Sequence, residues 1–264
     1  MAMFRFGSVN FHRGYNPGSE EVMNFALDKS LDVLLVQDVY RRVVERENFR
    51  DRWPHCNFAD TTVHFDATGQ SENTKVGIGV FTTLPVVGKS SEAYLLNMEP
   101  VPKLLRQAVT LAPNGNASAK DAALLATCES KIACSLKLSV DGKPVTVVTT
   151  HGPWRGEGEI NEELDRAMCG LLDIVMSLPG PLVMAGTSLF DRDDYTYRMF
   201  TNTGGLQDCI PRSLTNTIDW KNRGVTDGRD RVTSHILARG CKVFNVELVF
   251  GIAEHAALAA YVDV

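Results

Sequence analysis

Short apolar runs alternate with amphipathic stretches along much of the chain. Asp32–Gln37 is a short β-branched apolar run with polar residues at both ends, which is typical of a strand buried on both faces. Glu20–Lys29 has apolar residues at helical spacing, and Glu159–Leu178 repeats this spacing over a longer stretch. The alternation of strands with helices predicts an α/β fold.

Other apolar runs predict the remaining strands, and the pair Asp141-Gly142 is a hairpin turn signal between two of them. Hairpins mixed with strand–helix–strand units indicate two packed sheets flanked by helices. The stretch Asp191–Thr233 is rich in Asp, Asn, Thr and Gly, which predicts long loops with short helices. The further strands are predicted at Phe4–Phe11, Val76–Thr82, within Ala122–Leu138, and at Pro144–Thr150, Leu182–Ala185, Ser234–Leu237, Lys242–Val249 and Ala256–Val262.

The sequence contains no internal repeat, low-complexity segment or long linker, so we expect one domain over residues 1–264. Its six cysteines are scattered and include no C-x-x-C pair. We therefore expect free thiols in a reducing, intracellular compartment, and no organelle is indicated. No apolar run approaches the length of a membrane span, so no spanning segment is expected.

The formal net charge of −5 argues against a protein that coats nucleic acid by charge alone. One basic cluster interrupts this acidic balance, but Glu45, Glu47 and Asp51 are interleaved with it. Mixed charge of this kind is typical of a solvated helix face. The cluster consists of Arg41, Arg42, Arg46, Arg50 and Arg52.

Five predicted strands end in short polar tips, and these tips follow one another in a characteristic order. They are Ser8-Val9-Asn10, Leu35–Val39, Val148–His151, Val183–Leu189 and Ala253–His255. This order resembles the endonuclease/exonuclease/phosphatase superfamily, which includes DNases, abasic-site endonucleases, sphingomyelinases and inositol phosphatases. The resemblance extends over nearly the whole chain. It implies a DNase I-like, four-layer α/β/β/α sandwich of two mixed sheets flanked by helices.

Several of these tips keep the residue types with which that family hydrolyses phosphoesters, using Mg²⁺ or Mn²⁺. The resemblance implies that Asn10 positions a metal-ligand carboxylate and the phosphate, and that Asp38 binds the metal in place of the family's glutamate. His151 falls where an imidazole binds the phosphate or protonates the leaving group. Glu254 and His255 fall on an Asp-His pair whose carboxylate orients the imidazole for acid–base catalysis, and Glu254 is a further candidate metal ligand.

Other catalytic positions of the family have changed. Its Gly-Asp-Phe-Asn segment supplies a base for the attacking water and an amide for the transition state, but this chain reads Gly186-Thr187-Ser188-Leu189. Thr187 cannot serve as a general base near neutral pH, and Leu189 cannot donate a hydrogen bond. The Asp of the family's Ile-Asp-x-Ile strand falls on Ser234, the register that we favour, or on Asp230 in an alternative register.

Nearby carboxylates are candidates for the missing groups. Asp191, Asp193 or Asp194 would replace the lost base if their loop folds back, and Glu72 lies in the region of the family's second metal-site glutamate. Each retained residue also has a plain structural interpretation, as Asn10 does at a strand end, where it would form a turn. The other histidines, which we expect to be structural or on the surface, are His12, His55, His64 and His235.

The pattern of loss favours a catalytically impaired pseudoenzyme, which would act as a structural or binding subunit of a larger assembly, RNA-containing assemblies included. The alternative is an active divalent-metal-dependent phosphodiesterase or nuclease that uses Asp38, His151, Glu254 and His255. An unrelated α/β sandwich is a third interpretation. Candidate partners are nucleic acid, a phosphate ester and other proteins, and the substrate class stays open between DNA, RNA, phospholipid and inositol phosphate.

Overall fold

The computed structural model gives the fold of the chain over the ranges at the end of this paragraph. Several residues singled out in the sequence lie outside the described residues: His12, His64, Glu72, Leu189, Asp193, Asp230 and Glu254. The described residues are 2–11, 19–46, 49–63, 75–88, 91–96, 131–152, 162–187, 191–192, 194–219, 231–253 and 255–264.

Two six-stranded sheets form the centre of the fold. In each sheet one neighbouring pair is parallel, β1 with β2 and β7 with β8, and the other pairs are antiparallel. The order of sheet 1 is β11 (Lys242–Val249), β12 (Ala257–Asp263), β1 (Met3–Asn10), β2 (Val33–Tyr40), β4 (Lys75–Thr82) and β3 (His55–Val63). The order of sheet 2 is β5 (Ser91–Leu96), β6 (Lys131–Val140), β7 (Lys143–His151), β8 (Leu182–Thr187), β10 (Ser234–Arg239) and β9 (Gln207–Asp208).

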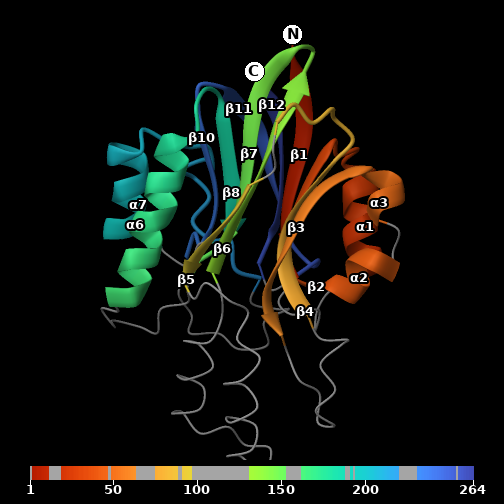
Figure 1. Ribbon diagram of the computed structural model, residues 1–264, viewed down its shortest axis with the longest axis horizontal. Coiled ribbons are helices and arrows are strands. Elements are labelled where there is room, and N and C mark those ends of the chain that lie inside the picture. Colours follow the sequence, from red (N-terminus) through yellow and green to blue (C-terminus); the bar gives the residue numbers. More distant parts are fainter. Residues whose placement is uncertain are drawn as a thin grey trace, which may run out of the picture.

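Helices cover the outer faces of both sheets, so the layers run helix, sheet, sheet, helix (Figure 1). This confirms the α/β sandwich of two mixed sheets that the sequence predicted. Sheet 1 carries α1 (Ser19–Asp28), α2 (Arg41–Arg46) and α3 (Phe49–Arg52). Sheet 2 carries α6 (Glu162–Ser177) and α7 (Tyr195–Arg198), and a π-helical turn, Met199–Thr203, continues α7.

The three apolar clusters of the fold follow from the period-two alternation of strand residues. In β2, Leu35 belongs to the cluster between the sheets, whereas Val36 belongs to the cluster beneath the helices of sheet 1. In β8, Val183 faces the other sheet and Met184 packs beneath α6. These strands are therefore buried on both faces, as their continuous apolar runs predicted.

The structure differs from the sequence prediction mainly in elements with a weak pattern. β3, β5, α2 and α3 were not assigned to specific residues, although the basic cluster was placed on a helix face, and Arg42, Arg50 and Arg52 are exposed there. β2 continues beyond Gln37 to Tyr40, because a bulge accommodates Asp38 within the strand. The stretch predicted as loops and short helices also contains the two-residue strand β9. No helix in the described part of the chain is long and apolar enough to span a membrane.

Candidate functional site

At one end of the sandwich the interface between the sheets changes from apolar to polar. In β7, alternate residues point in opposite directions, so Val147, Thr149 and His151 share the inner face that looks toward sheet 1. Val148 and Thr150 share the outer face beneath α6. The inner face thus passes from an apolar residue to a hydroxyl and then to an imidazole within five residues.

Gln37 links the two sheets in the first polar layer. Its side-chain Nε2 donates to Ser8 Oγ of β1, at 3.0 Å, and to Thr149 Oγ1 of β7, at 2.9 Å. All three side chains are buried. A buried amide needs such partners, because leaving it unsatisfied costs free energy. The glutamine that precedes the expected metal ligand therefore joins the two sheets.

Asn10 and His151 lie together at the next layer, where the inner faces of β1 and β7 meet. Their side chains are 3.3 Å apart between Asn10 Nδ2 and His151 Nε2. The amide nitrogen is the donor, so the ring nitrogen accepts. Asn10 is buried, whereas His151 keeps part of its surface exposed. Two residues that are 141 positions apart in the sequence are thereby brought into one site.

Thr187 and Ser234 stand next to His151 in sheet 2. His151 pairs with Thr187 across β7 and β8, and Thr187 pairs with Ser234 across β8 and β10. The two hydroxyl oxygens are 3.4 Å apart, and the exposed fractions of the two residues are only 1% and 3%. In the favoured register, the positions at which the resemblance expects two carboxylates therefore hold a buried hydroxyl pair.

His255 is oriented by a hydroxyl as well. Its Nδ1 lies 3.2 Å from Oγ1 of Thr233, which directly precedes Ser234. Thr217, which the sequence analysis missed, accepts hydrogen bonds from the backbone N–H groups of Thr233, at 2.9 Å, and Ser234, at 3.0 Å. The segment around Thr217 also bridges to His255 through Ile218. Nothing in the local sequence distinguishes Thr217 from other loop threonines, so only the fold reveals this positioning role.

Asp38 occupies a bulge instead of a regular strand position. Between Val36 and Val39, β2 advances three residues while β4 advances two, from Gly79 to Gly77. Asp38 has a φ of 55°, in the left-handed region that aspartate tolerates better than most residues. The side chain is partly exposed, and it directly follows Gln37, which pairs with Asn10 of β1.

Two of the carboxylates considered as replacement bases hold backbone groups instead. Asp191 Oδ1 accepts from its neighbour's N–H, that of Arg192, at 2.7 Å, and from the N–H of Val232 at 3.3 Å. Asp194 Oδ2 accepts from the N–H of Asp191 at 2.9 Å. These contacts fix the loop after β8 and tie it to the start of β10. Both carboxylates thus have structural partners.

The described residues do not fit a divalent cation on their own. Mg²⁺ prefers oxygen ligands, and carboxylates in particular. Among the described site residues Asn10, Asp38, His151, Thr187, Ser234 and His255, Asp38 supplies the carboxylate. No group of three or more His, Cys, Asp or Glu residues in the described ranges is arranged to hold a metal. The other expected metal ligand, Glu254, lies outside those ranges.

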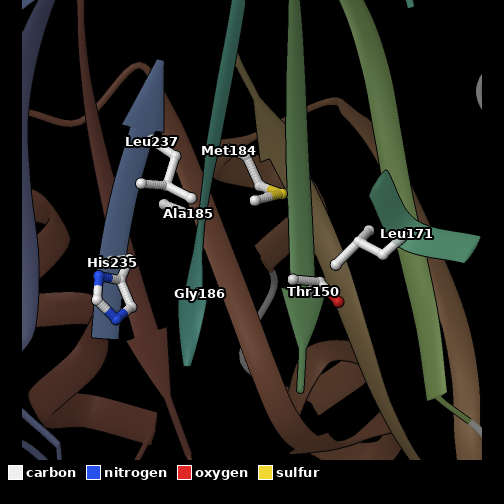
Figure 2. A pocket seen from close by; sticks show the side chains of 7 residues that line it. All are labelled: Thr150, Leu171, Met184, Ala185, Gly186, His235 and Leu237. Carbon is white, nitrogen blue, oxygen red and sulfur yellow. The ribbon is translucent and has the colours of Figure 1, made fainter. Parts of the chain in front are cut away.

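The outer face of the same strand ends lies beneath α6. Thr150, Gly186 and His235 lie on three neighbouring strands and line a cavity of about 10 Å³ beneath Leu171 of α6 (Figure 2). A cavity of this size holds about one water molecule. Gly186 is required here, because a Cβ atom on it would lie 2.1 Å from the backbone oxygen of Thr150. Figure 2 shows the His235 ring on this side of the sheet.

Tyr197 of α7 packs against His235, with ring centroids 5.6 Å apart. Its hydroxyl donates to Asp208 Oδ2 at 3.0 Å. Burial, together with the negative charge of Asp208, raises the pKa of Tyr197. Arg192 pairs with the same carboxylate oxygen at 2.7 Å, and both charged side chains are nearly buried. This group packs against His235 of the outer face.

Comparison with known proteins extends the likeness from local motifs to the whole fold. No family model matches the sequence, and no curated protein matches it. Solved structures match over the full chain. An endonuclease/exonuclease/phosphatase from Beutenbergia cavernae superposes with a TM-score of 0.71 at 15% identity, over 100% of this chain and 72% of that one.

Two further solved structures carry more specific names. The human Nocturnin catalytic domain with bound sulfate superposes with a TM-score of 0.65 at 14% identity, covering 99% of this chain and 93% of that one. A mannosyl-6-phosphatase from Bacteroides thetaiotaomicron superposes with a TM-score of 0.64 at 11% identity, covering 99% and 100%. With two mixed sheets between helices and polar strand tips at one end, this chain has the DNase I-like fold of the endonuclease/exonuclease/phosphatase superfamily.

Proposed function

We propose that this protein is a catalytically impaired member of the endonuclease/exonuclease/phosphatase superfamily that works as a binding or structural subunit. The observation that carries the proposal is the buried pair of Thr187 and Ser234, whose hydroxyl oxygens are 3.4 Å apart. In the register that we favour, they occupy the two adjacent strand positions at which the resemblance places carboxylates; in the alternative register Asp230 keeps the second carboxylate. The favoured register replaces both charges by hydroxyls that contact each other.

This pair lacks the chemistry that a hydrolase needs at these positions. A neutral hydroxyl does not accept a proton from water near pH 7, so Thr187 does not activate a nucleophile. Removing a positioned base or a transition-state donor lowers the rate by roughly a hundredfold to ten-thousandfold each. Such losses are not additive, but two of them leave little turnover.

The environment of His255 points the same way. In triad-like sites a carboxylate next to the ring stabilises the imidazolium that forms when the histidine takes a proton. Here Nδ1 of His255 faces the hydroxyl of Thr233 at 3.2 Å. A neutral hydroxyl fixes the orientation of the ring but gives the imidazolium much less stabilisation. The described contact of Nδ1 therefore orients the ring through a neutral group.

Binding is the property that the remaining site supports. Asn10 contacts His151, and His255 contacts Thr233, which directly precedes Ser234. We propose nucleic acid or another phosphate ester as the bound chemistry, with a protein assembly, RNA-containing assemblies included, as the setting. The Nocturnin domain with bound sulfate and the mannosyl-6-phosphatase show that this fold accommodates oxyanion ligands in other proteins.

An active Mg²⁺- or Mn²⁺-dependent phosphoesterase is the second candidate. The contact between Asn10 and His151 favours it, because the two residues meet at 3.3 Å as a phosphate-binding pair would. In that case Asp38 and Glu254 would hold the metal, and His151 and His255 would act on the phosphate. A measurement of metal-dependent turnover distinguishes this candidate from the catalytically impaired protein proposed above.

The test is hydrolysis of abasic DNA, RNA and bis(p-nitrophenyl) phosphate with Mg²⁺ or Mn²⁺, beside the variant His255→Ala. We expect no metal-dependent turnover above that of the variant on any of these substrates. Metal-dependent turnover that His255→Ala abolishes would overturn the proposal and establish the second candidate. Circular dichroism of the variant confirms that a lost signal does not reflect unfolding.

A further inference from the structure

A second pocket lies at the other end of sheet 2, away from the polar strand ends. Its volume is about 180 Å³, and its lining includes the first residues of β7, Lys137 of β6 and the loop Pro179–Pro181 that joins α6 to β8. Thr146 in this lining precedes His151 by five residues in β7. At a rise of about 3.4 Å per strand residue, the pocket is roughly 17 Å from the polar end and forms a separate site.

Two polar side chains of the pocket share one face of the hairpin β6–β7. Lys137 and Thr146 are directly opposite each other in the antiparallel register, which places their Cβ atoms about 5 Å apart. Thr146 lies on the same face as Val148, which packs beneath α6. Because α6 ends at Ser177, the loop that follows the helix, and not the helix itself, forms the wall beside this pair.

Neither polar group has a partner in the part of the chain that the structure describes. The Lys137 ammonium forms no ion pair there, and the Thr146 hydroxyl forms no hydrogen bond, although only 4% of Thr146 is exposed. A hydroxyl in such a position gains from a ligand that accepts its proton. The pocket therefore offers one cation and one neutral donor side by side.

The backbone holds the walls of the pocket in place. A Cβ atom on Gly88 would lie 3.4 Å from Cβ and 3.5 Å from Cδ of Lys137, so the lysine stem runs along this glycine. On the opposite wall, the carbonyl oxygen of Pro181 accepts from the backbone N–H of Thr146 at 2.9 Å. Gly180 has a φ of 77°, which fixes the turn between the two prolines of the loop. Fixed walls lose little conformational entropy when a ligand binds.

The apolar part of the lining consists mainly of proline rings. They belong to Pro144, Pro179 and Pro181. Proline rings are rigid apolar surfaces that pack well against aromatic rings, as in the recognition of proline-rich segments. One water molecule occupies about 30 Å³ of liquid volume, and pockets for drug-sized molecules have at least about 300 Å³. A volume of about 180 Å³ therefore suits a ligand with a single ring.

We infer that this pocket binds a carboxylate that is attached to a small aromatic ring. One carboxylate oxygen accepts from the Lys137 ammonium and the other from the Thr146 hydroxyl, while the ring packs against the prolines. A phosphate group fits less well, because it presents three oxygens and nearly two negative charges to a single cation. The inference goes beyond the proposed function and does not depend on it, since the pocket lies at the other end of β7.

The test is titration calorimetry with benzoate, for which we expect a dissociation constant of about 1 mM or lower. Lys137→Met keeps the stem but removes the charge, and should weaken binding by at least about tenfold. Thr146→Val keeps the shape but removes the hydroxyl, and should weaken binding by about fivefold. The matched control is Lys143→Met, which changes an exposed lysine of the same hairpin whose ammonium contacts the Val264 carbonyl; its affinity should equal that of the wild type.

Ligand comparisons separate the two halves of the inference. Benzamide keeps the ring without the charge, and acetate keeps the carboxylate without the ring, so each should bind at least about tenfold more weakly than benzoate. A short peptide that ends in phenylalanine, with a free carboxylate or as its amide, distinguishes the sources of this chemistry. Binding of the peptide acid but not of its amide identifies a chain terminus as the ligand, whereas binding of benzoate alone identifies a free ring acid.

Nuclear magnetic resonance locates the bound ligand. Benzoate should shift the backbone amide signals of Thr146 and Gly180 and leave that of His151 unchanged. Absence of binding, equal affinity in Lys137→Met, or shifts centred on His151 would overturn the inference. Circular dichroism checks the fold of each variant, and the ligand comparisons decide the question even if Thr146→Val does not fold. None of these results bears on metal-dependent hydrolysis, so a failure here is distinguishable from a failure of the proposed function.

Discussion

The two faces of the same three strand ends, in β7, β8 and β10, carry similar residue types but have different surroundings. On the inner face, His151, Thr187 and Ser234 follow one another across the strands and continue the polar layer between the sheets. On the outer face, Thr150, Gly186 and His235 occupy the adjacent positions, beneath α6. Each face thus has one histidine and one threonine. A move of one residue along a strand changes the face on which the side chain lies.

The difference lies in what covers each face. The outer residues line a small cavity of about 10 Å³ beneath α6, and Tyr197 packs against His235, which is buried, so this histidine is part of the packed interior. The inner residues include the partly exposed His151, which meets Asn10 from the other sheet. The outer face should therefore control stability, and the inner face should control ligand binding. The following predictions test this division.

The largest loss of stability should follow from breaking the ion pair that supports the outer face. Arg192 Nε lies 2.7 Å from Asp208 Oδ2, and its guanidinium also donates to loop carbonyls, including that of Leu214. Arg192→Met leaves the Asp208 charge buried, which should lower the free energy of unfolding by about 3–5 kcal/mol in urea denaturation.

The control for this variant is Arg198→Met, which changes an exposed arginine of α7 and should alter the same free energy by less than about 0.5 kcal/mol. A loss below about 1 kcal/mol in Arg192→Met would contradict the assigned role of the pair. Phosphate affinity should not change in either variant.

Gly186→Ala should give the next largest loss, because the new Cβ atom would lie 2.1 Å from the carbonyl oxygen of Thr150. The strands β7 and β8 must then move apart, at a cost of about 3 kcal/mol in the free energy of unfolding. Gly88→Ala is the matched control, since the nearest contact there is an ordinary 3.4 Å to a lysine side chain. Equal losses in the two variants would show that the close approach of β7 and β8 does not cause the loss of stability in Gly186→Ala.

Tyr197→Phe should cost about 2 kcal/mol near neutral pH, because it removes a buried hydrogen bond to the Asp208 carboxylate. Burial and Asp208 raise the pKa of Tyr197 above its ordinary 10.0. The neutral phenol is therefore favoured by folding, and its contribution is complete below pH 10 and disappears as the pH rises through the folded pKa.

Urea denaturation at increasing pH measures this dependence. The stability difference between wild type and Tyr197→Phe should be constant up to pH 10 and should narrow above it. Burial also raises the pKa of Cys209, to about 12, but that thiol is present in both proteins and cancels in the difference. A stability difference between the two proteins that instead grows as the pH rises would contradict a raised pKa of Tyr197.

The smallest change in stability should come from the inner face. The double variant Thr187→Val, Ser234→Ala removes both partners of a buried hydrogen bond and leaves neither hydroxyl alone. Its free energy of unfolding should stay within about 1 kcal/mol of the wild type, because apolar replacement of both partners is nearly neutral. Phosphate affinity should fall. A loss as large as that of Arg192→Met would break the proposed division between the faces.

The sequence predicted the sheets where the apolar pattern was continuous and missed elements where it was not. β2 and β8 were recognised from short apolar runs, whereas β3 reads His55–Val63 with polar residues at many positions and was not assigned. The bulge at Asp38 was also missed, because it depends on the register of β2 against β4, which no local pattern contains.

The candidate site shows the same limit. Five residues were singled out from their order along the chain: Asn10, His151, Thr187, Ser234 and His255. In the structure Asn10 contacts His151 and Thr187 contacts Ser234, whereas His255 contacts Thr233. The hydroxyl contact between Thr187 and Ser234 was not foreseen, because it joins residues 47 positions apart. The support that Thr217 gives to the start of β10 had no sequence signal at all.

By itself the sequence determined which residues lie in strands buried on both faces and which polar residues follow them, since side-chain alternation and burial are encoded locally. Only the tertiary structure decided which of these polar residues meet. Strand register and the packing of two sheets set that outcome, and both depend on the summed interactions of distant segments. The same physics makes His151 part of the candidate site and His235 part of the interior.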